Sequence, residues 1–375
     1  MGSEMDTTSL SDTGRRLERA RHAERFRTAT APARRLLEKY STIDWNAPQE
    51  FPTFRTHNRL LLDAARKNKV IKREVYNGYR TFTQNGAVIG GFHQLTTSLT
   101  SDLAKSAMAS RPLVKAHLEA MGLPTPVGRT FAPEETEAGA RFFRGLSGPV
   151  TVTPSVGPRG GGVSEGIEEE SALYPAWEFA QTEHKLKTAH SPGIHLEQRE
   201  PGLDIRVYVV GETVISALAQ LPLFIVGDGS STVGVLAGAA VDGRSRNSYL
   251  AQTPPDVSAE SLSELGLDAG EVLAAGDIHD ISGTSDPAAG GMTLDVTAKL
   301  GRSLRQLAVD ALWALPGLRA GGVDLRVADL THGAEAVVTD INDAADMALH
   351  RYPAFGSWHA PAAHIINQML IASKV

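Results

Sequence analysis

The chain has 375 residues, of which 42% are hydrophobic and 21% charged, and its formal net charge is −6. That balance gives no electrostatic case for nucleic acid or an anionic membrane as a partner. The lack of cysteine excludes disulfides, thiolate nucleophiles and thiolate-bound metals. No apolar run approaches ~20 residues and no apolar signal core opens the chain, so we expect a soluble, cytoplasmic protein. The length of the chain predicts two or three subdomains.

The first fifty residues are expected to form an extension that is partly disordered and partly helical. Residues 1–13 are polar, a composition typical of disorder. Residues 15–40 carry Arg and Glu at helical spacing among Leu and Phe, which predicts one or two amphipathic helices. The basic run at residues 15–19 could contact an acidic partner, but such a run is more often a solvated helix face.

From about residue 54 the pattern predicts a small α/β subdomain. Residues 58–65 have the apolar spacing of a helix, and residues 79–89 alternate as a hairpin that turns at Asn85-Gly86. A long helix is predicted from Ser101 to Met121, ending at Gly122.

A glycine-rich loop, residues 157–164, follows a predicted strand at residues 149–153. Glycines let backbone N–H groups wrap closely around a phosphate, because no Cβ obstructs the approach. Alone this is a weak signal, since many surface loops are equally rich in glycine.

Two antiparallel strands are predicted near the C-terminus, at residues 321–325 and 339–342, with a turn around residues 331–333. Asp324 then lies on the first strand, and Asp340 and Asn342 share one face of the second. Two carboxylates and an amide oxygen at a strand end suit Mg²⁺, which prefers hard oxygen ligands and often shares them with substrate phosphates. A polar hairpin edge without a metal explains the spacing equally well.

These last residues also resemble a known family. Asp340-Ile341-Asn342, with Met347 and His350 downstream, resembles the metal-binding end of the ATP-grasp carboxylate–amine ligases. The resemblance is closest to the ATP-grasp part of cyanophycin synthetase and of the bifunctional glutathione synthetases, where Glu stands in place of Asp340. Residues 226–233 and 286–297 carry the same resemblance in the centre of the chain.

The resemblance implies a mixed α/β (α+β) architecture, the ATP-grasp fold. Residues 1–50 would be the extension, residues 51–126 an N-terminal subdomain, and residues 127–205 a lid with the glycine-rich loop. Residues 206–375 would form the C-terminal catalytic subdomain. ATP and Mg²⁺ would be the cofactors.

The resemblance also implies site residues. Glu197 and the backbone around Gln198 would meet the adenine edge, Asp204 the ribose hydroxyls, and Arg206 the acyl-phosphate. The full ATP-binding set would be Arg111, Thr153, Arg159, Gly160, Gly161, Gly162, Glu197, Gln198 and Asp204. Arg206 and Arg111 would be the catalytic cations, and Asp324, Asp340 and Asn342 the metal ligands. Substrate would contact Arg206, Ser282, Gly290, Gly291 and His350, although a packed structural role for His350 is equally compatible with the pattern.

The chain departs from the family pattern at three cationic positions. The family's Asp-Lys pair becomes Ser110-Arg111, with Lys115 one turn later. A phosphate-binding strand Lys becomes Thr153, and an Arg before the Gly-Gly turn becomes Ser282. Loss of one charge-assisted hydrogen bond to phosphate costs about 1.5–3 kcal/mol.

We therefore predict an ATP-dependent ligase that joins an amino acid or peptide carboxylate to an amine through an acyl-phosphate. Peptide natural-product biosynthesis is the expected setting, with glutamate as one candidate acid and small molecules as the partners. A homodimer is left open. The alternatives are a degenerate ATP-grasp protein that binds a ligand without turnover, favoured by Thr153 and Ser282, and a scaffold partner of another ligase.

Overall fold

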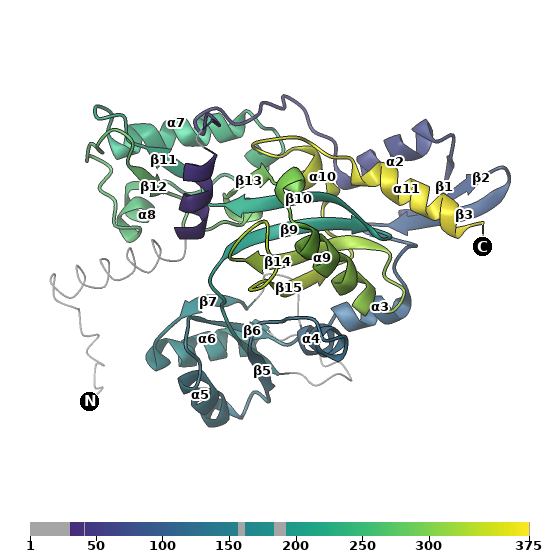
Figure 1. Cartoon of the computed structure of the whole chain (residues 1–375), viewed down its shortest axis with the longest axis horizontal. Coiled ribbons are helices and arrows are strands. Elements are labelled where there is room, and N and C mark those ends of the chain that lie inside the picture. The colour runs from purple at the N-terminus through teal and green to yellow at the C-terminus, as the bar shows by residue number, and fades with distance from the viewer. Residues whose placement is uncertain (1–30, 41, 157–161, 184–192, 375) are drawn as a thin grey trace, which may run out of the picture. The chain divides into compact units, whose positions relative to one another are not determined.

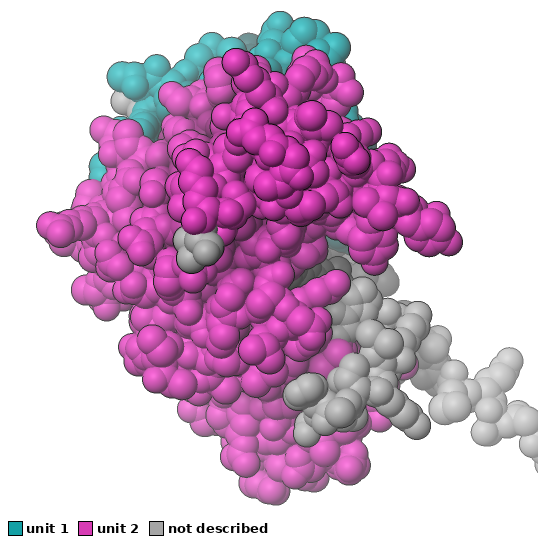
Figure 2. Space-filling model, turned by 90° about the vertical axis from the view of Figure 1, so that its right-hand side faces the viewer, with its two compact units in different colours: residues 1–54, 220–294, 352–355 teal, residues 55–219, 295–351, 356–375 magenta. Residues whose placement is uncertain are grey.

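The computed structural model describes residues 31–40, 42–156, 162–183 and 193–374 (Figure 1). Contacts divide the chain into two compact units, coloured separately in Figure 2. Unit 1 comprises Met1–Phe54, Gln220–Leu294 and Tyr352–Phe355, and unit 2 comprises Arg55–Ala219, Asp295–Arg351 and Gly356–Val375. This is a coarser division than the four ranges expected from the sequence, which stay a prediction. No helix in the described part is both long and apolar enough to cross a membrane.

Unit 2 begins with a helix and a small antiparallel sheet. The helix is α2 (His57–Lys67), and the sheet has the order β1 (Ile71–Tyr76), β2 (Tyr79–Gln84), β3 (Ala87–His93) and β4 (Thr96–Thr97). Asn85 and Gly86 both have positive φ, at 52° and 83°, as a two-residue hairpin turn with right-handed strand twist requires. The predicted helix and hairpin are confirmed.

The single helix predicted over residues 101–121 is wrong, because the segment forms two helices. They are α3 (Asp102–Met108), capped by the Ser101 hydroxyl, and α4 (Arg111–Ala120). Pro112 stands in the first turn of α4. In a continuous helix Pro112 would have no N–H to donate to the carbonyl of Met108, four residues earlier, and its ring would clash with that carbonyl. The first helix therefore ends at Met108, and Ser110, with φ −131° and ψ 113°, is the extended N-cap of the second.

A second antiparallel sheet, here called the middle sheet, has the order β5-β8-β6-β7. Its strands are β5 (Gly128–Phe131), β6 (Val150–Pro154), β7 (Ser164–Ile167) and β8 (Ile194–Gln198), accompanied by α5 (Thr136–Arg144) and α6 (Glu170–Glu183). Val152 and Leu196 pack with Trp177 of α6 and Ala140 of α5 in one buried cluster. Because side chains alternate along a strand, Thr153 and His195 point to the opposite face.

The main sheet of unit 2 places four antiparallel strands in the order β10-β9-β14-β15. They are β9 (Leu203–Val210), β10 (Thr213–Leu221), β14 (Ala320–Val327) and β15 (Val337–Asn342). The predicted C-terminal hairpin is thus confirmed. The helices α9 (Arg302–Ala314), α10 (Met347–Arg351) and α11 (Pro361–Ala372) follow or interrupt these strands, and η3 (Thr297–Lys299) precedes α9. Tyr208 of β9 is buried in one cluster with Leu61 of α2 and Ile365 of α11.

Unit 1 has a two-stranded sheet of β11 (Phe224–Val226) and β12 (Ile278–Asp280). Its remaining elements are a helix over residues 31–39, α7 (Val233–Ser245), η1 (Leu250–Gln252), α8 (Ala259–Glu264), η2 (Pro287–Ala289) and β13 (Met292–Asp295). Helix 31–39 confirms part of the predicted N-terminal helices, and residues 15–30 lie outside the described residues. Arg244 is buried and donates hydrogen bonds to the carbonyl oxygens of Leu250, Pro287 and Gly291. This burial lowers the pKa of its guanidinium to about 10.

Candidate functional site

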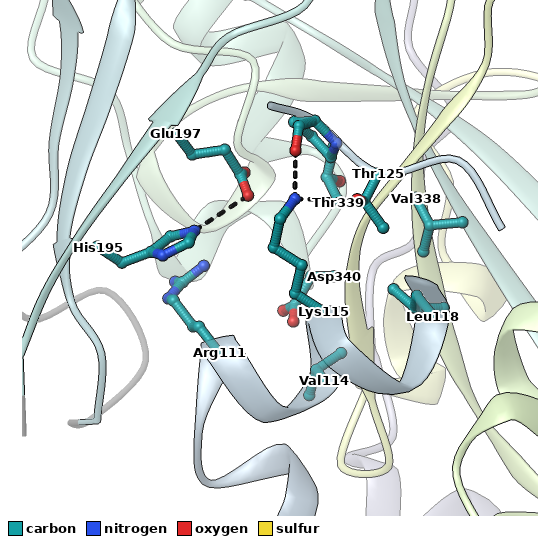
Figure 3. Close-up of a pocket in the computed structure, with 11 residues that line it drawn as sticks. Arg111, Val114, Lys115, Leu118, Thr125, His195, Glu197, Val338, Thr339 and Asp340 are labelled. Carbon is teal, nitrogen blue, oxygen red and sulfur yellow. Dashed lines mark hydrogen bonds and ion pairs between the residues drawn. The ribbon is translucent and has the colours of Figure 1, made fainter. Parts of the chain in front are cut away.

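A pocket within unit 2 collects charged side chains from three elements (Figure 3). Helix α4 contributes Arg111 and Lys115, β8 contributes His195 and Glu197, and β15 contributes Asp340. The other lining residues are Val114, Leu118, Thr125, Pro126, Val338 and Thr339. Three of the predicted site residues, on elements far apart in sequence, therefore meet at one pocket.

The two cations of α4 are held differently. Lys115 Nζ donates hydrogen bonds to Thr125 Oγ1, at 2.9 Å, and to the Pro126 carbonyl. The Arg111 guanidinium forms no ion pair with any residue that the structure describes, and in Figure 3 it lies beside His195. Its backbone N–H donates to the Ser155 carbonyl at 3.1 Å, which ties the start of α4 to the end of β6. Arg111 is thus the pocket cation available to a ligand. No role was expected for Lys115 from the sequence, although its four-residue spacing from Arg111 places it on the same helix face.

His195 links the pocket to the interior of the middle sheet. Its Nδ1 lies 2.9 Å from Thr130 Oγ1, and its Nε2 lies 3.3 Å from Glu197 Oε2. The ring is 4% exposed. No function was expected for His195 from the sequence, because its partner Thr130 is 65 residues away in the chain.

Thr153, a predicted phosphate contact, lies directly opposite His195 in the register of β6 and β8. Paired residues of an antiparallel sheet point to the same face, so the two side chains are neighbours. Thr153 is buried, and its hydroxyl has no hydrogen-bond partner in the described part of the chain. It is not among the pocket-lining residues.

Arg206, Asp324 and Asp340 form one row across β9, β14 and β15 of the main sheet. Arg206 donates from Nε to Asp324 Oδ1 at 2.8 Å and from Nη2 to Asp324 Oδ2 at 2.7 Å. A predicted catalytic cation is therefore paired with a predicted metal ligand. Since Asp340 also lines the pocket, this row and the pocket are parts of one site.

The next row of the main sheet holds Asp204, the predicted ribose contact. Its Oδ1 accepts from Arg326 Nε at 2.9 Å, and Arg199 Nη2 lies 3.6 Å from its Oδ2. Gln198, the predicted adenine contact, uses its backbone N–H to bond the Val127 carbonyl at 2.8 Å, and its Oε1 accepts from the Ser147 N–H at 3.0 Å.

The predicted metal ligands all offer hard oxygen atoms, which fits Mg²⁺ chemically. Asp324 and Asp340 are cross-strand neighbours, and Asn342 follows on the same face of β15. Asn342 Oδ1 accepts from the Ala344 N–H at 2.8 Å and keeps one lone pair. A metal would share Asp324 with Arg206. Within the described residues, no group of three or more His, Asp or Glu side chains could hold a metal ion, so such a site depends on the amide and on substrate oxygens.

The remaining predicted residues have other surroundings. Ser282 Oγ accepts from the Leu223 N–H at 2.9 Å, within unit 1. Gly290 and Gly291 also belong to unit 1, where a Cβ on Gly290 would come within 2.7 Å of Pro255. Gly162 is buried with φ 70°, whereas Arg159, Gly160 and Gly161 lie outside the described residues.

His350 is fully buried in unit 2. Its Nδ1 lies 2.8 Å from Ser216 Oγ, and its ring meets the Tyr208 ring edge-on at 5.3 Å. Burial, reinforced by the positive charges of Arg206 and His359, lowers the pKa of His350 to about 3. The structure therefore places it as a neutral packed side chain, and its predicted contact with substrate stays a prediction.

Because the pKa of His350 is lowered in the folded protein, we expect the free energy of unfolding to fall at acid pH. The pKa of His350 is 6.5 in the unfolded chain and about 3 in the folded chain. At pH values between these two, the unfolded chain binds the proton and the folded chain does not. The free energy of unfolding should then be unaffected above pH 6.5 and fall by up to about 1.4 kcal/mol per pH unit below it. Urea unfolding at pH 7.5, 6.5, 5.5 and 4.5 measures this, with His350→Asn as the non-titrating comparison. Equal pH slopes for the two proteins would contradict it.

No family model matches the chain. It is 26% identical over 260 residues to the glutathione biosynthesis bifunctional protein GshAB of Streptococcus mutans. The aligned region covers 68% of this chain and 32% of that protein. It is 24% identical over 266 residues to the cyanophycin synthetase of Geminocystis herdmanii, covering 68% and 29% of the two chains. The chain thus spans about a third of the length of the curated relatives it matches.

A solved structure shows the same fold. The bifunctional glutathione synthetase of Pasteurella multocida superposes with a TM-score of 0.58 and 20% identity, over 84% of this chain and 43% of that one. The middle and main sheets together therefore define the ATP-grasp fold. In sequence the chain is similar to the bifunctional glutathione proteins and the cyanophycin synthetases.

Proposed function

We propose that the chain is an ATP- and Mg²⁺-dependent ligase that joins the carboxylate of an amino acid or peptide to an amine. The observation that carries this proposal is the row of Arg206, Asp324 and Asp340, in which Asp340 lines one pocket together with Arg111 and Glu197. Cations and carboxylates arranged in this way can bind a nucleotide phosphate chain through both direct contacts and a shared metal.

The reaction takes two balanced steps. An oxygen of the acid's carboxylate attacks the γ-phosphorus of ATP, the new C–O–P bond forms, and the bond to the β,γ-bridging oxygen breaks to release ADP. The neutral amine then attacks the acyl carbon, the carbon–oxygen bond breaks, and phosphate leaves as the amide nitrogen gives its proton to solvent. No protein base for this proton is identified in the described part of the chain.

Each residue has a role that follows from its place. Arg111 contacts the phosphates, because its guanidinium is not committed to another described side chain. Arg206 offsets charge on the acyl-phosphate and is kept in orientation by Asp324. Mg²⁺ bound by Asp324, Asp340 and Asn342 supplies further neutralisation of phosphate charge.

The relatives narrow the substrate class. Their names place them in glutathione biosynthesis and cyanophycin synthesis. For this chain we propose an amino acid or peptide acid, with glutamate the first candidate, in a cytoplasmic pathway that makes peptide natural products.

A second candidate function is ligand binding without turnover. It is favoured by the complete pairing of Asp324 with Arg206, which occupies both carboxylate oxygens, and by the uncharged hydroxyl at Thr153. Under this alternative the main-sheet row is a structural ion pair.

Calorimetry with ATP and Mg²⁺ tests the proposed function. The native protein should bind with a dissociation constant on the order of 1–100 μM, within the usual substrate range. Asp340→Ala should abolish binding, whereas Glu335→Ala, which removes an exposed carboxylate from the same hairpin, should not. A phosphate-release screen over pairs of amino acids would then identify substrates. No binding by native protein, restored by Thr153→Lys, would favour the second candidate.

A further inference from the structure

Asp295 and His359 form a carboxylate–imidazole pair beside β10 of the main sheet. Asp295 is the last residue of β13, the strand next to β10, and His359 comes shortly before α11. His359 Nε2 lies 3.1 Å from Asp295 Oδ1, and the two side chains are 24% and 10% exposed. Because an ionised carboxylate only accepts, Nε2 carries the hydrogen, and Nδ1 has the lone pair of the neutral ring.

Further donors hold the Asp295 carboxylate in one orientation. Its Oδ1 also accepts from the Thr297 backbone N–H at 3.1 Å and from the Thr297 hydroxyl, and its Oδ2 accepts from the Ser357 N–H at 3.3 Å. The Thr297 hydroxyl in turn accepts from the Ala217 N–H of β10 at 2.8 Å. The imidazole is therefore oriented by a carboxylate that is itself fixed to the sheet, as in catalytic pairs where a third group orients the base.

The second ring nitrogen of His359 is open to a ligand. Nδ1 has no hydrogen-bond partner among the residues that the structure describes, and it is not enclosed, unlike Nε2 of the neighbouring His350. Trp358, next in the chain, is 52% exposed. A neutral imidazole with one nitrogen held by a carboxylate and the other accessible can take a proton from a bound molecule.

The register of the sheet places this pair near Arg206, the residue proposed to stabilise the acyl-phosphate. Thr297 is bonded to Ala217, and the next residue of β10, Leu218, pairs directly with Arg206 of β9. Only β10 separates β13 from β9. At about 4.8 Å between neighbouring strands, the backbones of β13 and β9 are about 10 Å apart, a span that an amino acid can cover.

His350 connects the two sides. Its carbonyl accepts from the His359 N–H at 2.9 Å, and the positive charges of Arg206 and His359 both act on its buried ring. The charged and titratable groups around His359 are therefore Asp295, His350 and, beyond His350, Arg206 and Asp346. Asp295 is the carboxylate in direct contact with the ring, so a proton taken up by His359 is offset there.

We propose that His359 is the base that takes a proton from the ammonium form of the amine substrate, with Asp295 as its positioning residue. An ammonium ion has no lone pair and cannot attack the acyl carbon. The Nδ1 lone pair accepts one proton, which leaves a neutral amine and an imidazolium ion, and the imidazolium gives this proton to solvent before the next turnover. The proton lost after the attack still goes to solvent. This role rests on the proposed function, since it requires an acyl-phosphate beside Arg206.

Two nucleophiles that differ in charge test this role. The assay contains ATP, Mg²⁺, the twenty standard amino acids and a tryptic digest of casein at pH 7.0, where most amino groups are ammonium ions. Amides are detected by mass spectrometry. Hydroxylamine, which is mostly neutral at this pH, is added in a parallel assay and traps the acyl-phosphate as a hydroxamate.

H359Q should lose one product and keep the other. Amide formation at pH 7.0 should fall by about 10²-fold or more, the usual contribution of a positioned base, whereas hydroxamate formation should stay within about threefold of native. At pH 9.5, where the amines are largely neutral, amide formation by H359Q should approach that of native protein. D295N, which removes the charge that orients and offsets the ring, should show the same selective loss. H364Q, at an exposed histidine of α11, is the matched control and should change neither product.

The outcomes are distinguishable. If H359Q keeps amide formation, or loses amide and hydroxamate equally as a structural role predicts, the inference is overturned and the proposed function stands. If native protein forms neither product, the proposed function is overturned and the inference with it. Should both variants fail to fold, native protein decides. With a working base its amide formation should change less than about threefold between pH 7.0 and 9.5, and a rise of about tenfold or more, in step with the neutral amine, overturns the inference.

Discussion

Asp324→Ala is expected to lower ATP-driven phosphate release by roughly 10²–10³-fold, the effect of removing one preorganised electrostatic group. It should also lower the free energy of unfolding by about 1.5–3 kcal/mol. The reason is that Arg206, whose side chain is only 25% exposed, loses both hydrogen bonds and stays largely desolvated. Steady-state phosphate release and urea unfolding measure the two effects.

A double-mutant cycle on Arg206 and Asp324 separates these effects. The exposed pair of Arg144 and Glu170, whose side chains are 51% and 35% exposed, is the matched control and should show a coupling energy below about 1 kcal/mol. If Asp324→Ala loses stability and keeps full turnover, Asp324 serves only as the partner of Arg206, and the proposed metal site is wrong.

Trp177→Ala should lower the free energy of unfolding by about 3–5 kcal/mol, the cost of deleting a buried aromatic side chain. Trp177 is 2% exposed, lies 6.1 Å from the Phe131 ring, and donates from Nε1 to the Pro133 carbonyl at 2.9 Å. It also lies so close to Gly139 that a Cβ there would come within 2.4 Å of its ring. Removing the ring leaves a cavity between α5, α6 and the middle sheet.

Urea unfolding monitored by circular dichroism measures this loss. Trp358→Ala is the matched control, because Trp358 is 52% exposed and stacks against the Arg351 guanidinium, which lies 3.8 Å from the centre of its ring. The control should lose about 1 kcal/mol or less. Equal losses in the two variants would show that the middle sheet does not depend on the Trp177 cluster.

The sequence predicted features that depend on local spacing. Alternation along a strand placed Asp340 and Asn342 on one face, and the Asn85-Gly86 pair predicted a hairpin turn, because both follow from backbone geometry over a few residues. The resemblance to ATP-grasp ligases predicted the fold, which the solved relative bears out. The break before α4 could have been found from Pro112, because a proline cannot donate to the carbonyl four residues earlier and clashes with it, which is also a local effect.

Only the tertiary structure decided which side chains become partners. The pairing of Arg206 with Asp324 joins residues 118 apart, and that of Thr130 with His195 joins residues 65 apart, so both depend on strand order and register. Strand register between distant segments is selected by the burial of whole faces and is not encoded at any single position. The sequence by itself determined which donor and acceptor groups this protein has. The register and packing of the middle and main sheets determined which of these groups become the neighbours of Glu197, Arg206 and Asp340.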